Sequence, residues 1–151
     1  MMDYLRNSDK KIDTKILSTK TIYGNAENMK CLNIDNYIPC YEINRIRYIE
    51  YEKAFMETIV INGKVCPDIL KHYNDKSSLF SIFKNIYNCD IKGGEEVIEL
   101  NYANKQNSKL LDIKEGSPLF YVYGNTFNSN NEYIEYYKIL FKFNLFKMVI
   151  N

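Results

Sequence analysis

The spacing of apolar positions along the chain changes repeatedly between two residues and three to four residues. A period of two is typical of strands, and the longer period is typical of helices that pack one face on a core. The mixture predicts an α+β domain with one antiparallel sheet of about five or six strands and short helices on one side. The alternating segments place strands at 13–23, 40–50, 54–61, 95–103, 119–127 and 133–143.

Capping residues indicate where the short helices begin. Asn25 precedes an apolar stripe at 26–32, and Ser78 precedes a second stripe at 79–86. Asn and Ser are favoured there because their side chains accept hydrogen bonds from the first free backbone N–H groups of a helix. Further short helices are predicted directly after Pro67 and at 104–111.

Turn residues determine how the predicted strands align. Gly93-Gly94 is predicted to be a turn, and the run Asn128-Ser129-Asn130-Asn131 connects the last two strands. A two-residue turn at Ser129-Asn130 would place Glu135 opposite Gly124. Since glycine has no side chain, this alignment predicts open space in front of the Glu135 carboxylate.

The charge balance excludes a domain that grips nucleic-acid phosphates by itself. The chain has 151 residues, with 20 Lys and Arg against 19 Asp and Glu, so its net charge is only +1. Its length is that of one domain. No apolar run approaches the roughly 20 residues needed to cross a bilayer, and the N-terminal residues lack the apolar core of a signal peptide. We therefore expect a cytoplasmic protein.

The cysteines and the histidine do not form a recognisable metal-binding motif. The four cysteines, at positions 31, 40, 66 and 89, are widely spaced, no C-x-x-C occurs, and His72 is the only histidine. A zinc site would normally show closely spaced ligand pairs. We expect reduced, partly buried thiols, a solvated His72, no metal and no cofactor.

The strongest chemical signal lies in the run Tyr41-Glu42-Ile43-Asn44-Arg45-Ile46-Arg47. With a period of two, Arg45 and Arg47 project from one face of the strand together with Ile43. Arginine is seldom buried without a partner, and its planar guanidinium matches carboxylate and phosphate. The pattern predicts that the pair binds an anion. The alternative is a pair of surface arginines in ordinary ion pairs.

Two more polar residues are predicted near this pair. A three-residue loop at Tyr51-Glu52-Lys53 would place Glu57 opposite Arg47, where it serves either a ligand or only the charge of Arg47. Ser78 caps its helix, and because a helix start favours anions it could also serve a bound phosphate. Capping alone would need no ligand.

Six segments occur together in a recognisable order. They are Tyr41-Glu42-Ile43-Asn44-Arg45-Ile46-Arg47, Glu57, Cys66-Pro67-Asp68-Ile69-Leu70, Ser78-Leu79-Phe80-Ser81-Ile82-Phe83, Leu110-Leu111-Asp112-Ile113-Lys114-Glu115-Gly116-Ser117-Pro118-Leu119 and Tyr133-Ile134-Glu135-Tyr136. In this order and spacing the chain resembles the UTRA domain, the effector-binding part of transcription regulators in the HutC branch of the GntR family. The resemblance runs from about Ile12 to Met148.

The resemblance implies a chorismate-lyase-like fold, a homodimer and a small-molecule pocket beside the sheet. In full-length relatives a winged helix-turn-helix domain precedes this one, and occupancy of the pocket changes the placement of the two DNA-binding heads. On this interpretation residues 1–11 are a tail or linker remnant, and residues 12–151 are the effector-binding domain. DNA is then a partner only through a domain that this sequence lacks.

The same resemblance implies a set of ligand-binding residues. In relatives that sense sugar phosphates, the residues matching Arg45 and Arg47 contact the phosphate. Phe80 and Phe141 stand where those sensors have tyrosines, and Gly124 stands where many have arginine, so a drier pocket with fewer donors is expected. A sugar phosphate is the expected effector and a carboxylate its competitor. The full predicted set is Arg45, Arg47, Glu57, Ser78, Phe80, Glu135 and Phe141.

Three functions remain open from the sequence. The first is a ligand sensor of a transcription regulator, which binds a small anion without turnover. The second is a chorismate-lyase-like enzyme, because fold alone does not determine function. The third is a ligand-free dimerisation module in which Arg45, Arg47 and Glu57 neutralise one another. No acid and base pair stands near a nucleophile in the pattern, so a protein that is not an enzyme is expected.

Overall fold

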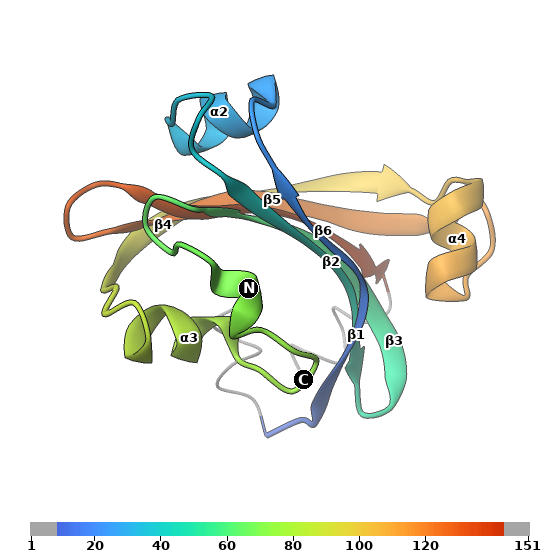
Figure 1. The fold of residues 1–151 in the computed structure, drawn as a ribbon. Coiled ribbons are helices and arrows are strands. Elements are labelled where there is room, and N and C mark those ends of the chain that lie inside the picture. Colours follow the sequence, from blue (N-terminus) through green and yellow to red (C-terminus); the bar gives the residue numbers. More distant parts are fainter. Residues whose placement is uncertain (1–8, 144–151) are drawn as a thin grey trace.

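A computed structural model of the protein describes residues 9–143. Most of the predicted tail and the end of the resemblance at Met148 lie outside this range. Six strands form one antiparallel sheet with the order β1-β2-β3-β6-β5-β4, which confirms the predicted class (Figure 1). Their bounds are β1 Ile12–Ile22, β2 Cys40–Ile49, β3 Glu52–Asn62, β4 Ile91–Tyr102, β5 Pro118–Asn128 and β6 Tyr133–Lys142.

The short helices begin where the capping residues predict. Asn25 accepts a hydrogen bond from the backbone of Asn28 at 3.1 Å, and Ser78 accepts one from Ser81 at 3.2 Å. These bonds satisfy N–H groups that a helix start would otherwise leave free. The helices are α2 Ala26–Leu32, the single-turn η1 Ile69–Lys71, α3 Leu79–Asn85 and α4 Lys105–Leu111.

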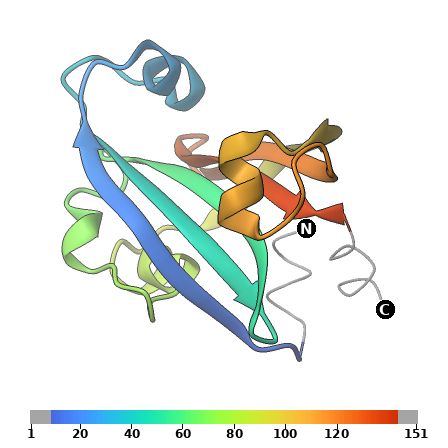
Figure 2. The same cartoon turned by 90° about the vertical axis from the view of Figure 1, so that its right-hand side faces the viewer.

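The helices divide between the two faces of the sheet. Ile69 of η1 and the apolar side of α3 join the main core on the face that carries Ile59. Leu32 of α2 packs on Val60, which points to the opposite face because neighbouring strand residues alternate. Helix α4 packs on this second face through Leu111. The prediction of helices on one side therefore holds only for η1 and α3, as Figures 1 and 2 show.

The hairpin between β2 and β3 determines the alignment of Glu57, which the sequence left open. Glu50 and Tyr51 both have positive φ, 49° and 70°, which is typical of a two-residue turn that matches the twist of the strands. The pairing then shifts by one residue between Arg47 and Tyr48. As a result Glu57 lies opposite Arg45, and the three-residue loop that would have placed it opposite Arg47 does not form.

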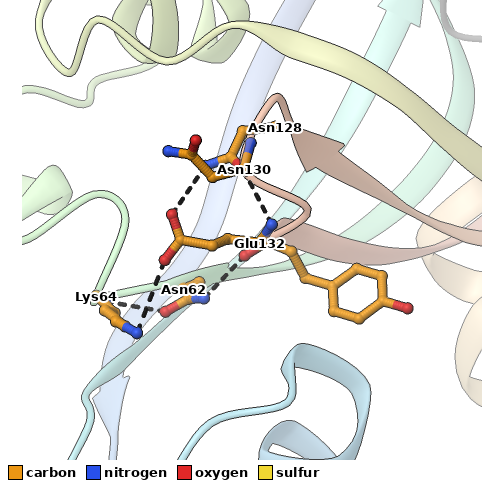
Figure 3. A network of polar contacts seen from close by, with 6 residues as sticks. Asn62, Lys64, Asn128, Asn130 and Glu132 are labelled. Atoms are coloured by element: carbon orange, nitrogen blue, oxygen red, sulfur yellow. Dashed lines mark hydrogen bonds and ion pairs between the residues drawn. The ribbon is translucent and has the colours of Figure 1, made fainter.

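A polar network closes the hairpin between β5 and β6 (Figure 3). The Asn128 side chain accepts hydrogen bonds from the backbones of Asn130 and Glu132 at 3.0 and 2.9 Å. Asn62 at the end of β3 donates to the Tyr133 carbonyl at 2.8 Å, and Lys64 lies 3.7 Å from the Glu132 carboxylate. The turn is therefore longer than Ser129-Asn130 and is held to the neighbouring strand.

This longer turn moves Glu135 away from its predicted partner. Glu135 lies opposite Thr126, and Gly124 lies opposite Tyr137. A Cβ on Gly124 would stand 2.9 Å from the Tyr137 hydroxyl and 2.2 Å from the Glu95 carbonyl oxygen. The predicted open space above Gly124 is wrong, because the Tyr137 side chain and strand β4 fill it.

Gly93 and Gly94 do not form the predicted turn, because both lie inside β4. A Cβ on Gly94 would stand 2.3 Å from the carbonyl oxygen of Asn125 on β5. Glycine thus allows close approach of two backbones here, which is its other common use in strands. The sequence pattern does not show whether a Gly-Gly pair forms a turn or allows two strands to approach closely.

The cysteines are free, as predicted, and all except the half-buried Cys31 are buried. Cys40 is 2% exposed and packs with Leu32, Val60 and Tyr136. Within the described residues, no helix is long and apolar enough to cross a membrane. No group of three or more His, Cys, Asp or Glu side chains in the same range is arranged to hold a metal ion.

Stability is expected to fall in alkaline solution because the folded protein holds the Cys40 proton. Burial raises the pKa of the Cys40 thiol from 9.0 to about 11. The unfolded chain therefore releases this proton first, so the stabilisation is complete below the unfolded pKa and is lost as pH rises through the folded pKa. From this group we expect the free energy of unfolding to drop by about 1 kcal/mol between neutral pH and about pH 10. Urea unfolding at a series of pH values measures the effect.

The control for this expectation is a pair of cysteine variants. Cys40→Ala removes the titrating thiol, so its stability should decline less steeply with pH by about the same 1 kcal/mol. Cys31→Ala, at a half-buried position, should keep the Cys40 contribution. An equal alkaline decline in Cys40→Ala and the wild type would show that Cys40 is not the group responsible.

Candidate functional site

A cavity of about 1050 Å³ lies on the face of the sheet that carries α3. Its lining comes from the central strands, from the edge strands β1 and β4, and from the segment that leads into α3. Six of the seven sequence-predicted site residues line it, and Phe141 does not. The six are Arg45, Arg47, Glu57, Ser78, Phe80 and Glu135.

Arg45 is held rigidly at the floor of the cavity. Its side chain is 5% exposed, and its Nε donates to Oε1 of Glu57 at 2.5 Å. Nη1 of Arg45 donates to the hydroxyl of Tyr73 at 3.0 Å. Burial by itself lowers the pKa of Arg45, but the Glu57 carboxylate and Tyr73 outweigh it, so the pKa is raised. Arg45 is therefore a fixed, permanently charged group.

Arg47 has no comparable partner among the described residues. Its Nη1 lies 3.7 Å from the same Glu57 oxygen, beyond hydrogen-bond distance. Its Nε is buried and has no hydrogen-bond partner within residues 9–143. Burial, and then the positive charge of Arg45, lower the pKa of Arg47. Two guanidinium groups thus share one carboxylate, which leaves a surplus positive charge and an unused donor.

The start of α3 forms the wall beside the arginines. Ser78 caps this helix with its hydroxyl and also lines the cavity, so the structural role and exposure to a ligand coexist. Phe80 is half-buried and adds an apolar part to the same wall. Tyr73 lies in the segment that leads to Ser78, and its bond to Arg45 ties that segment to the sheet.

The far part of the cavity is rich in acceptors. Glu135 projects from β6, and Glu96 projects from β4 on the same face. The Tyr137 hydroxyl donates to Oε2 of Glu96 at 2.6 Å. Burial and this carboxylate raise the pKa of Tyr137. Thr126, opposite Glu135, has a buried hydroxyl oxygen without a hydrogen-bond partner in residues 9–143.

Phe141 lies in the core and not at the cavity surface. Its side chain is 1% exposed, and its ring centroid lies 4.5 Å from that of Phe55. Alternation along β6 correctly places Phe141 on the same face as Tyr137, but this row of the sheet is covered by packed side chains. The structure therefore separates Phe141 from the other predicted site residues.

Several cavity residues were missed from the sequence. Tyr137 carries a usable signal, because it lies two residues after Glu135 on the same strand face. Glu96 and Thr126 depend on how β4 and β5 align, which the misassigned glycines hid. Tyr73 lies in an irregular segment, where no period indicates which way a side chain points.

The comparisons with known proteins give a family model, curated relatives and solved structures of similar fold. A family model described as the UTRA domain matches residues 7–147. A probable fructoselysine utilization operon transcriptional repressor from Escherichia coli (strain K12) is 22% identical over 120 residues, which are 80% of this chain and 49% of that protein. The chain spans about half the length of the curated relatives it matches.

Solved structures of similar fold include two C-terminal domains. The C-terminal domain of Yurk from Bacillus subtilis subsp. subtilis str. 168 has a TM-score of 0.77 and 26% identity, over 85% of this chain and 88% of that one. The C-terminal domain of the histidine utilization repressor from Pseudomonas syringae pv. tomato str. DC3000 has a TM-score of 0.78 and 18% identity, over 89% and 93%. At 18% identity the second match supports the fold alone.

Proposed function

The chain belongs to the UTRA domain family, and from this premise we propose that it is the effector-binding domain of a HutC-type transcription regulator of the GntR family. The proposed effector site is the cavity on the α3 face of the sheet, and the effector is a small anion, either a sugar phosphate or a carboxylate. The effector binds without turnover. Its anionic group contacts Arg45 and Arg47, and Ser78 and Phe80 form the adjacent wall.

The surplus charge at Arg47 is the observation that carries this proposal. A module without a ligand would need Arg45, Arg47 and Glu57 to neutralise one another, but one carboxylate meets two guanidinium groups. A partly buried charge without a full counter-charge and an unused buried donor are costly, so native proteins usually give them partners. An anion in the cavity would supply the missing charge at Arg47, whose side chain is 17% exposed.

The remaining parts of the proposal concern partners. A winged helix-turn-helix domain outside this sequence would contact DNA, and two copies of the chain would form a homodimer. The near-neutral charge of the chain supports the view that DNA is not bound here directly. Placement in the cytoplasm follows from the proposed role in transcription.

Arg47→Met is expected to weaken effector binding without loss of stability. Charge-assisted hydrogen bonds contribute about 1.5–3 kcal/mol each, so the affinity for the anion should fall about tenfold or more. Stability should stay constant or rise, because the variant removes a surplus, partly buried charge. Calorimetric titration with a panel of sugar phosphates and small carboxylates measures affinity, and thermal unfolding measures stability.

Lys20→Met is the matched control, because Lys20 is an exposed cation on β1 outside the cavity lining. It should bind every probe as the wild type does. If no probe in the panel raises the unfolding temperature, or if Arg47→Met binds as tightly as the wild type, the proposed site is wrong. Release of pyruvate from chorismate would establish a lyase in place of a sensor.

A further inference from the structure

The two ends of the cavity have opposite chemistry. The β2 end presents donors, the guanidinium groups of Arg45 and Arg47. The other end, on β6 and β4, presents the carboxylates of Glu135 and Glu96. A ligand long enough to touch both ends needs an acceptor group at one end and donors at the other.

Two hydroxyl groups lie beside the carboxylates at the acceptor-rich end. The single hydrogen of the Tyr137 hydroxyl is used on Glu96, so its oxygen can only accept from a ligand. The Thr126 hydroxyl oxygen is buried without a hydrogen-bond partner among the described residues, although it lines the cavity. Glu135 and Glu96 have other interactions in the protein. A carboxylate has about four acceptor sites, so one further donor can be accommodated.

The net charge of the cavity lining indicates whether the ligand's donor at this end is an amine or a hydroxyl group. The described residues that line the cavity include six acids and only four bases. Water screens the exposed groups of both signs, which are Lys76 and Lys92 among the bases and Asp75, Glu95 and Glu96 among the acids. The less exposed groups are three acids and two bases, so the excess of acids remains. A purely anionic ligand would balance the arginines but leave the acids in the rest of the lining without a counter-charge. A ligand that also carries a positive charge avoids this penalty.

We propose that the effector is amphoteric, with an anionic group at Arg45 and Arg47 and an ammonium group at Glu135 and Glu96. The inference rests on the proposed function, because it assumes that the arginine end takes the anion. Glu135 and Glu96 are then specificity-determining residues that select amine-bearing anions over amine-free ones.

Matched pairs of phosphates test the inference. The pairs are glucosamine phosphate and glucose phosphate, aminoethyl and ethyl phosphate, aminobutyl and butyl phosphate, and aminohexyl and hexyl phosphate. In calorimetric titration of the full chain, at least one amine-bearing member should bind about tenfold or more tightly than its amine-free match. Glu135→Gln or Glu96→Gln should reduce that advantage to less than about threefold and leave the amine-free match unweakened.

Glu99→Gln is the matched control, since Glu99 lies on the same strand as Glu96, is exposed and does not line the cavity. It should preserve the full preference for the amine. Equal affinities within every pair, or a preference for the amine that persists in both cavity variants, would overturn the amphoteric ligand. The proposed function would still stand if binding depended on Arg47. Absence of binding by every probe would overturn both.

Discussion

Arg45→Ala is expected to destabilise the protein by about 3–5 kcal/mol, the cost of leaving one member of a buried ion pair without its partner. Glu57 is 3% exposed and accepts from Arg45 at 2.5 Å, whereas Arg47 lies 3.7 Å away and does not replace that bond. The variant also removes the donor to Tyr73 and so releases the segment before α3. Urea unfolding at neutral pH measures the loss, and effector binding should be lost with it.

A second substitution separates the charge from the packing. Glu57→Gln in the Arg45→Ala background removes the uncompensated negative charge, so it should recover a large part of the lost stability. Arg47→Ala should cost far less than Arg45→Ala, because Arg47 is the surplus cation of the site. Equal costs for the two arginines would contradict the division of roles between a structural Arg45 and a ligand-seeking Arg47.

Phe141→Ala is expected to cost about 3–5 kcal/mol, because it removes a fully buried ring and leaves a cavity in the core. The ring packs on Phe55 with 1% of its surface exposed. Denaturant unfolding gives the size of the loss. Affinity for the effector, measured at a temperature where the variant is folded, should change little, because Phe141 does not line the cavity.

Phe141→Tyr and Phe80→Tyr form a matched pair that tests which of the two rings lies at the cavity surface. A hydroxyl added at Phe141 enters an apolar core without a partner, so it should cost about 1–3 kcal/mol. A hydroxyl added at Phe80 reaches the cavity wall, so it should be tolerated and should alter affinity for the effector. A tolerated Phe141→Tyr with altered affinity would return Phe141 to the site.

Local patterns predicted the elements better than their alignment. The alternation in β2 correctly put Arg45 and Arg47 on one face, because side-chain direction in a strand follows from neighbouring residues alone. The partner of Glu57 stayed open in the sequence, because it depends on a two-residue turn and a one-residue shift in pairing. A shift of one residue changes every pair of residues across the two strands. The alternation of apolar and polar residues does not show where such a shift occurs.

The site residues also divide into those that local sequence predicts and those that depend on strand alignment. Ser78 and Phe80 could be predicted to reach a ligand from the family resemblance and the start of α3, and both line the cavity. The contribution of Tyr137 and Glu96 could not, since it arises where β6 and β4 approach across Gly124. Phe141 shows the converse, because a residue on the correct face can still be covered by the core.

By itself the sequence determined the fold class, the helix starts and the family, because each is written in residues close together or in an ordered set of motifs. The charge surplus at Arg47, the acceptor-rich end of the cavity and the burial of Phe141 were decided only by the tertiary structure. The physical reason is that burial and pairing depend on side chains from distant strands, whose alignment is determined by turns and bulges that leave little trace in periodicity.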